Sequence, residues 1–358
     1  MVPVRFPRCP DTTGPATRSC RAVAGRYLTG RREAGGRPSL ATRASMPTMT
    51  NDAAEPTIHR PTLMTVHAHP DDETIGTGGV MAKAVKAGHR VILVTCTRGE
   101  LGEIVVAEMD TPENHRRLGE IRAGELERAM AVLGVTEWEN LGYRDSGMMG
   151  TDGNRDPRSF WQADLDEAAR RLTWLVRRYQ PDVMTTYNDF GGYGHPDHIR
   201  THDVAVRAFE RAGDPTWYSE QFEAPGIEAW APAKLYEQAI PASVRARMEA
   251  RLKELGRKSF WEPPDDATPE QVAEMEAFAA RMLVPDESIT TWIDVSGAPL
   301  EAKWKAIHEH VTQISDESPF MLLGLDGWRE GWANESFILR ESRVRSTLPE
   351  TDLFAGIV

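Results

Sequence analysis

Two short stretches of the sequence concentrate side chains that bind metals or move protons. Residues 67–73 read His-Ala-His-Pro-Asp-Asp-Glu and follow a short apolar run. Residues 191–198 read Gly-Gly-Tyr-Gly-His-Pro-Asp-His and follow a second apolar run at 182–187. Ligands of open α/β sheets bind where strands end at their carboxyl edge. We therefore expect the two stretches to contribute to one site.

The first stretch has the composition of a hydrolytic metal site. His69 and Asp72 offer one nitrogen and one oxygen ligand, which suits zinc among the divalent metals. Such a site needs about three protein ligands, an open position for water, and a nearby carboxylate that is not a ligand. Asp71 and Asp72 are adjacent, so in a turn one can bind metal while the other faces the water. The alternative is a polar loop whose aspartate caps the next helix.

The second stretch supplies the best candidates for the missing ligand. Pro196 fits the first position of a helix, so His195 and His198 would lie one turn apart and address a single point. The three glycines before them let the backbone approach a ligand closely, and Tyr193 can place a hydroxyl donor there. Either histidine alone is more simply explained as a packed or capping imidazole. The combination favours a ligand site.

Composition narrows the class of protein. The net charge is −12 over 358 residues, so nucleic acid is not an expected partner. The sequence has no run of about 18 apolar residues, so no membrane span is expected. Three scattered cysteines do not form a disulfide framework and fit a reducing, cytoplasmic location. Cys96 lies in an apolar run, where we expect it to pack in the core.

Residues 1–58 differ from the rest of the chain. The first 46 contain nine arginines against two acids, a balance of +7, and have no apolar period. This composition predicts disorder. Two interpretations stay open: an Arg-rich transit-type leader, or an over-extended start with Met46 or Met49 as the true first residue. We favour the second.

From residue 62 onward the pattern alternates between buried strands and amphipathic helices. We predict strands around 63–66 and at 90–97, 138–141, 182–187, 234–240 and 288–295, and helices at 74–87, 113–133, 161–179, 196–212, 241–256, 270–283 and 299–311. Repeated β-α units indicate an α/β, Rossmann-like fold with a mostly parallel sheet and helices on both faces. We expect one domain over 59–358. Its core would span 60–213, and a C-terminal extension over 214–358, turn-rich after 315, would complete the sheet edge and shape the substrate pocket.

Both motifs together resemble those of the LmbE-like (PIG-L-type) N-acetylglucosaminyl deacetylases, and within them the mycothiol-pathway group. The resemblance runs from about residue 60 to the C-terminus. It implies zinc, with Fe²⁺ as the alternative occupant in the cell, bound by His69, Asp72 and His198. It also implies the following roles: Asp71 as general base, Tyr193 and His195 as stabilisers of the oxyanion with His195 protonating the leaving amine, and Asp197 tuning His195.

Four further residues match substrate contacts of that family. Glu103 lies in Thr-Arg-Gly-Glu-Leu-Gly-Glu and would meet a sugar hydroxyl, and Arg122 lies in Arg-Ala-Gly-Glu. Asp145 lies in Tyr-Arg-Asp-Ser-Gly-Met, and His310 in His-Val-Thr-Gln. Without the resemblance, each would be interpreted as a solvated surface group or a capping residue.

The resemblance implies hydrolysis of an amide on a glucosamine nitrogen. Residues 144–151 resemble the N-acetylglucosaminyl-inositol deacetylases, whereas residues 113–120, 184–187 and 350–357 resemble the mycothiol S-conjugate amidases. The substrate is then a small amino sugar or a thiol conjugate. The sequence leaves the choice between them open, together with the oligomeric state.

The sequence also allows two functions from other classes to be compared with this one. Gly76-Thr-Gly-Gly79 after the first strand could indicate a dinucleotide-binding oxidoreductase, but the spacing G-x-G-x-x-G is absent. Carboxylates at 71–73 would repel a pyrophosphate, and the second strand ends in Thr97-Arg98 rather than in an acid for the ribose. A non-catalytic sugar-binding module would not need a free carboxylate beside a metal site.

Overall fold

The protein is described by a computed structural model covering residues 60–259, 261–318 and 320–357. The predicted leader at 1–58, with Met46 and Met49, lies outside the described residues. The strands are β1 Thr62–His67, β2 Arg90–Thr97, β3 Glu137–Tyr143, β4 Val183–Thr186, β5 Lys234–Gln238, β6 Ile240–Pro241, β7 Leu283–Val284, β8 Thr291–Asp294 and β9 Asn334–Ser342.

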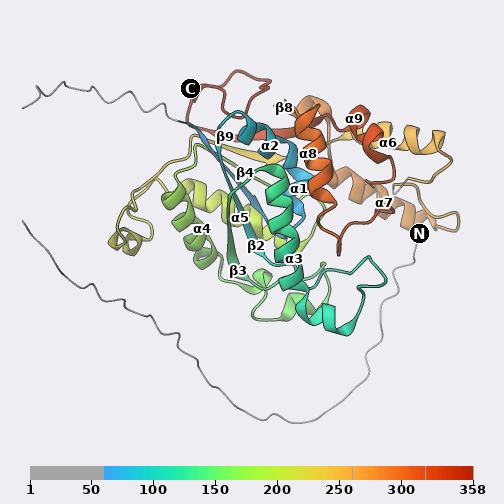
Figure 1. The fold of residues 1–358 in the computed structure, drawn as a ribbon, viewed down its shortest axis with the longest axis horizontal. Coiled ribbons are helices and arrows are strands. Elements are labelled where there is room, and N and C mark those ends of the chain that lie inside the picture. Colours follow the sequence, from blue (N-terminus) through green and yellow to red (C-terminus); the bar gives the residue numbers. More distant parts are fainter. Residues whose placement is uncertain (1–59, 260, 319, 358) are drawn as a thin grey trace, which may run out of the picture. The chain divides into compact units, whose positions relative to one another are not determined.

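The helices alternate with these strands in the first half of the chain and cluster in the second (Figure 1). The α-helices are α1 Asp72–Gly76, α2 Gly78–Lys86, α3 Pro112–Leu133, α4 Leu165–Tyr179, α5 Pro196–Arg211, α6 Ala242–Glu254, α7 Pro269–Met282, α8 Ala298–Ile307 and α9 Gly324–Gly331. Short 3₁₀ helices are η1 Asp152–Arg155, η2 Phe160–Gln162, η3 Ser219–Glu223 and η4 Asp286–Ser288.

Seven strands form one sheet in the order β3-β2-β1-β4-β5-β9-β8. The pairs from β3 to β5 are parallel, whereas β9 runs antiparallel to β5 and to β8. This confirms the predicted α/β class with a mostly parallel sheet. The prediction that the tail after residue 315 is rich in turns missed strand β9, which lies between β5 and β8 in the sheet. Its only apolar run is Phe337-Ile-Leu339, too short to stand out against the polar residues around it.

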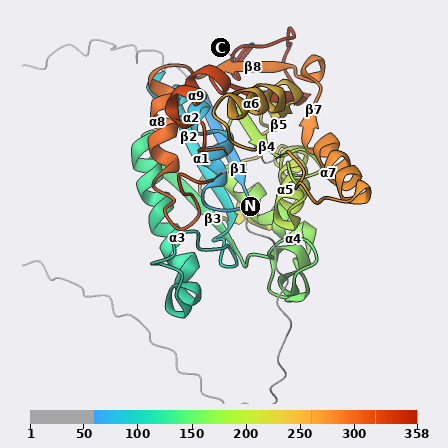
Figure 2. The same ribbon diagram turned by 90° about the vertical axis from the view of Figure 1, so that its right-hand side faces the viewer.

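Side chains alternate between the two faces of the sheet, as β-strand geometry requires. Val91 and Leu93 of β2 enter a core with α2, α3 and α8, while Ile92 and Val94 enter a second core with α4 and α5. Figure 2 shows these two groups of helices on opposite sides of the strands. Helices therefore cover both faces, as predicted. Cys96 is fully buried in the second core, which confirms its packing role.

One predicted helix, at 74–87, is in fact two. Helices α1 and α2 are separated by Thr77, whose backbone leaves the helical region at φ −134°. The Thr77 hydroxyl donates to the carbonyl of Glu73 at 3.2 Å and lies 2.9 Å from Nε2 of His67. The Thr77 N–H still donates to the Glu73 carbonyl at 3.0 Å, so the break between the two helices lies in the backbone angles of Thr77.

The sheet order brings the two motifs together. Strand β1 lies between β2 and β4 and pairs in parallel with both. The order reverses at β1, and such a switch point opens a crevice at the carboxyl ends of the strands. Residues 67–73 leave the end of β1 and residues 188–198 leave the end of β4. Both therefore reach the same crevice.

The C-terminal extension completes the sheet and touches the second motif. Strands β5, β9 and β8 extend the sheet beyond β4. On α7, the Phe278 ring lies 6.2 Å from the Phe190 ring, and the Arg281 guanidinium lies 3.9 Å from the same ring. Phe190 belongs to the loop that carries Tyr193, so the extension supports one wall of the crevice. Among the described residues, no helix is both long and apolar enough to cross a membrane.

Candidate active site

The first motif forms a tight turn into α1. The backbone N–H of His69 donates to Oδ2 of Asp72 at 2.8 Å, which fixes the carboxylate at the start of the helix. The same oxygen lies 3.3 Å from Nδ1 of His69. The Asp72 carboxylate is thus held against His69 by local geometry alone, as the spacing of three residues predicts.

The second motif forms the N-terminus of α5. His195 is the N-cap and Pro196 the first helical residue, as predicted. Nδ1 of His195 accepts the backbone N–H of Asp197 at 3.1 Å, which leaves the imidazole proton on Nε2. His198 follows one turn later, and the Tyr187 ring at the end of β4 stacks on its imidazole at 4.3 Å between centroids.

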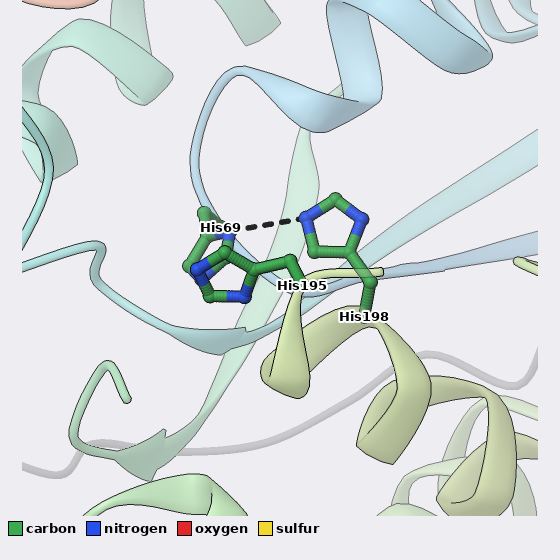
Figure 3. A group of neighbouring side chains, drawn as sticks. All are labelled: His69, His195 and His198. Carbon is green, nitrogen blue, oxygen red and sulfur yellow. Dashed lines mark hydrogen bonds between the residues drawn. The ribbon is translucent and has the colours of Figure 1, made fainter. Parts of the chain in front are cut away.

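Three atoms of the two motifs that are able to bind a metal form a nearly equilateral triangle. His69 Nδ1, Asp72 Oδ2 and His198 Nε2 are separated by 3.3 Å on all three sides. Figure 3 shows the contact between His69 and His198, with His195 beside His69. Both histidines are buried, with exposures of 6% and 2%. Burial alone would raise the pKa of Asp72, but His198 and His69 hold it well below its usual range.

These residues fit a divalent metal ion. A tetrahedral ion with bonds of about 2.0–2.1 Å requires ligand atoms about 3.3–3.4 Å apart. Nitrogen atoms of His69, His195 and His198 also lie within 4.8 Å of one another. The Nδ1 atom of His195 is already an acceptor for a backbone N–H, so only its Nε2 faces the other groups. His195 thus offers one nitrogen to this cluster, and Asp72 offers an oxygen 3.3 Å from a nitrogen of His69 and of His198.

The Asp197 carboxylate contacts His69 and Ser146. Its Oδ2 lies 3.2 Å from Nε2 of His69 and accepts the Ser146 N–H at 2.9 Å, and its Oδ1 accepts the Ser146 hydroxyl. His195 is hydrogen-bonded by the Asp197 backbone N–H, and a carboxylate oxygen of Asp197 lies within 4.8 Å of a ring nitrogen of His195, so its tuning of His195 stays a prediction. A carboxylate behind a ligating histidine fixes its tautomer and raises its basicity.

Asp71 lies beside the triangle of His69, Asp72 and His198 but does not form part of it. Its Oδ1 lies 3.2 Å from Nη2 of Arg122. Burial raises the pKa of Asp71 to about 6 despite the opposing charge of Arg122, with the neighbouring Asp72 adding to the rise. A carboxylate with such a pKa is a stronger base than an ordinary aspartate. The divergence of Asp71 and Asp72 expected from the sequence is present.

The remaining predicted residues separate into two groups. Arg122 and Asp145 are buried at the site: Arg122 donates to the carbonyls of Pro70 and Gly99, and Asp145 Oδ1 lies 3.8 Å from Nε2 of His69. Tyr193 places its hydroxyl 3.4 Å from Nε2 of His198. Glu103 is exposed, and its backbone carbonyl accepts from Gln313. His310 is fully buried on Glu73 rather than facing open space.

Two residues in the site were not singled out from the sequence: Tyr187 packs on His198, and Ser146 binds Asp197. Glu73 of the first motif binds His310. Ser146 directly follows Asp145 in the matched motif, so its position was a usable signal. His67 belongs to the first motif but lies behind the site, where burial lowers its pKa to about 4 and Tyr187 and Thr77 contact its ring.

The glycines after the first motif do not form a dinucleotide site. A pyrophosphate would bind the free N–H groups at the start of α2. The N–H groups of Gly79 and Val80 instead donate to the two carboxylate oxygens of Glu335, each at 2.8 Å. Lys303 neutralises that carboxylate at 2.7 Å. The Glu335 carboxylate therefore occupies the N-terminus of α2, where a pyrophosphate would have to bind. The oxidoreductase alternative is wrong.

Comparison with known proteins agrees with this geometry. Residues 64–209 match the family model PIG-L, described as GlcNAc-PI de-N-acetylase. The chain is 41% identical over 302 residues to a 1D-myo-inositol 2-acetamido-2-deoxy-alpha-D-glucopyranoside deacetylase of Geodermatophilus obscurus, covering 82% of this chain and 97% of the relative. A deacetylase 1 of the same name from Catenulispora acidiphila is 42% identical over 325 residues, covering 88% and 95%.

A solved structure shares the fold. N,N'-diacetylchitobiose deacetylase from Pyrococcus horikoshii aligns with a TM-score of 0.52 at 20% identity, covering 78% of this chain and 83% of that one. At this identity the likeness concerns the fold alone. The matches to the two sequence relatives cover nearly the whole length of each relative. The buried histidine–aspartate cluster is that of a metalloenzyme. The chain therefore belongs to the PIG-L (GlcNAc-PI de-N-acetylase) family of metal-dependent hydrolases.

Proposed function

We propose that this enzyme removes the acetyl group from 1D-myo-inositol 2-acetamido-2-deoxy-α-D-glucopyranoside, releasing acetate and the free amine. The relatives at 41% and 42% identity are named for this reaction. The single observation that carries the proposal is the 3.3 Å triangle of His69, Asp72 and His198 with Asp71 beside it. This arrangement combines three ligands with a carboxylate that is not a ligand.

Zinc is the metal that these residues suit best. Two imidazole nitrogens and one carboxylate oxygen form a common catalytic zinc set, with a fourth position open. When bound, the ion would polarise the amide carbonyl and lower the pKa of water. Asp197 would hold His69 in the tautomer with a free Nδ1, through its contact with Nε2.

Asp71 is the proposed general base. A water molecule adds to the amide carbonyl carbon, and Asp71 accepts its proton as the C–O bond forms. The C–N bond then breaks, and the nitrogen must receive a proton to leave as an amine. The pKa of Asp71, raised by burial to about 6, suits it to accept the first proton and to return it in the second step. Arg122 orients the carboxylate from 3.2 Å.

His195 and Tyr193 are the proposed stabilisers of the oxyanion. Nδ1 of His195 is an acceptor, so its Nε2–H is a hydrogen-bond donor. Burial lowers the pKa of His195 to about 2, and the neighbouring His69 and His198 add to the lowering. A neutral imidazole donates a hydrogen bond but is a poor acid. We therefore propose His195 as a donor to the oxyanion, and assign protonation of the amine to Asp71.

The decisive variant is Asp71→Asn, which keeps the shape of the side chain but cannot accept a proton. We expect turnover to fall by about 10²–10⁴-fold with zinc content unchanged. Replacing Asp189 by Asn is the matched control, since Asp189 is an exposed aspartate next to the second motif. Near wild-type turnover of zinc-loaded Asp71→Asn would show that the base has been misassigned.

The S-conjugate amidase reaction is the second candidate. Its support comes from sequence segments 113–120, 184–187 and 350–357, which resemble that group. Both reactions break an amide on a glucosamine nitrogen, so the same residues would serve. Parallel assays with the N-acetyl substrate and with a thiol-conjugate amide distinguish them. A higher kcat/KM for the thiol conjugate would reassign the substrate and leave the mechanism in place.

A further inference from the structure

The proposed base sits on an unusual piece of backbone. Asp71 has φ 110° and ψ −35°, a region that residues with a Cβ rarely enter. The other non-glycine residues with positive φ among those described are Gln180 and Tyr218, at φ 49° and 53°, both in the ordinary left-handed region. Strained backbone persists only where the surroundings over-determine it. The contacts around Asp71 identify what holds it.

A buried carboxylate binds the backbone of Asp71 directly. Oε2 of Glu73 accepts the Asp71 N–H at 2.9 Å. The other oxygen, Oε1, lies 2.9 Å from Nε2 of His310. Glu73 and His310 are both fully buried, and 237 residues separate them along the chain. His310 follows α8, so an element of the C-terminal extension holds the turn of the first motif.

Each oxygen of Glu73 accepts from its own donor, so this position requires a carboxylate. A carboxylate is an acceptor at both oxygens, so it can serve the Asp71 N–H and the His310 imidazole together. A glutamine has one acceptor oxygen and would oppose one of the two donors with its own NH₂ group. Keeping both contacts would require the His310 proton to move to Nδ1, which is buried without a hydrogen-bond partner among the described residues, so Glu73→Gln weakens this arrangement without changing the volume of the side chain.

The strained turn is what separates the two adjacent aspartates. Asp72 Oδ2 lies in the ligand triangle with His69 and His198, whereas Asp71 Oδ1 faces Arg122. The Asp71 carbonyl accepts the N–H groups of Thr74 and Ile75, so the residue is anchored on its other side by α1. The direction of the Asp71 side chain then depends on the N–H anchored by Glu73.

We propose that Glu73 and His310 are positioning residues that hold the backbone of Asp71 in its strained conformation and thereby aim its carboxylate at the attacking water. The inference rests on the proposed function, in which Asp71 is the base. Among the described residues, the side chains of Glu73 and His310 make no hydrogen bond to His69, Asp72 or His198. Their loss should thus misplace the base and leave the metal bound.

The experiment compares Glu73→Gln, His310→Leu and His310→Gln in the full-length, zinc-loaded enzyme. We expect kcat to fall by about 10–100-fold in Glu73→Gln and His310→Leu, with KM and zinc content little changed, because small misplacements of a catalytic group cost up to about 10²-fold. The His310→Gln variant keeps a nitrogen donor near the place of Nε2, so it should recover most of the turnover. His308→Leu is the matched control, since His308 is an exposed histidine two residues away.

Several results would overturn the inference. They are wild-type kcat in Glu73→Gln, equal impairment of His310→Gln and His310→Leu, or loss of zinc with loss of turnover. If Glu73→Gln does not fold, the two His310 variants decide the matter through their difference in kcat. A crystal structure of Glu73→Gln or His310→Leu gives a readout independent of activity, since residue 71 should leave φ near 110°. An unchanged φ would refute the inference, and a wild-type enzyme inactive on amides would refute the proposed function instead.

Discussion

The carboxylate of Asp197 lies 3.2 Å from Nε2 of His69, although 128 residues separate them in the chain. It accepts two further hydrogen bonds, from the N–H and the hydroxyl of Ser146. His69 can therefore present Nδ1 to Asp72 and His198 while its other nitrogen is occupied. The Asp197 carboxylate thus fixes the orientation of the His69 imidazole.

Asp197→Asn should weaken metal binding while the protein stays folded. An amide accepts more weakly than a carboxylate and can turn its NH₂ group toward the histidine, so His69 loses basicity and a fixed tautomer. We expect the affinity for zinc to fall by about 10–100-fold. Competition with a chromophoric chelator measures the change, with the exposed Asp189→Asn as control. An unchanged affinity would mean that Asp197 does not support the metal.

Glycine and alanine at position 71 should rank in the reverse of their usual order of stability. Both variants lose the carboxylate near Arg122, but only alanine keeps the Cβ that makes φ 110° costly. We expect Asp71→Gly to be more stable than Asp71→Ala by about 1–3 kcal/mol. Denaturant unfolding of the two proteins measures the difference. At an unstrained site alanine would be the more stable, and that order would refute the strain.

Arg177 should be essential for stability and unimportant for catalysis. It is fully buried and donates to the carbonyls of Ala212, Asp214 and Trp217 and to the side chain of Gln221. Arg177→Met leaves these acceptors without a donor, which we expect to cost about 3 kcal/mol or more. Thermal unfolding should show a lower Tm, while kcat at low temperature stays near wild type. The control is Arg178→Met, because Arg178 is the exposed neighbour.

The buried pair of His310 and Glu73 should make stability depend on pH. Burial opposes the charge on His310, but Glu73 outweighs this effect and raises the pKa of His310 above its usual value. A raised pKa in the folded state stabilises the protein fully below pH about 6.5, and this contribution is lost as the pH rises through the raised value. The difference in free energy of unfolding between wild type and His310→Gln should therefore shrink from about pH 6 to pH 9. A difference that grows over this range would contradict the assignment.

Much of the fold and of the site follows from local patterns in the sequence. The strand at 90–97 coincides with β2, and the helix predicted at 113–133 differs from α3 by one residue. Apolar periodicity is a local property, so it reports these elements well. The contact between His69 and Asp72 is local too, because three residues of one turn contain it. Pro196 likewise fixes the start of α5 by its own geometry.

Other features depend on neighbours that are distant in the chain. The sequence by itself predicts His69, Asp71 and Asp72 directly after the first strand and His198 in the first turn of a later helix, and the family resemblance implies their use by a metal-dependent hydrolase. Only the tertiary structure decided that Asp197 supports His69, that Glu73 and His310 hold Asp71, and that β9 joins the sheet. These partners are 128 and 237 residues apart, or paired through a strand with little apolar signal. The order of strands in the sheet and the direction of each side chain determine such contacts, and neither can be predicted from the local spacing of residues.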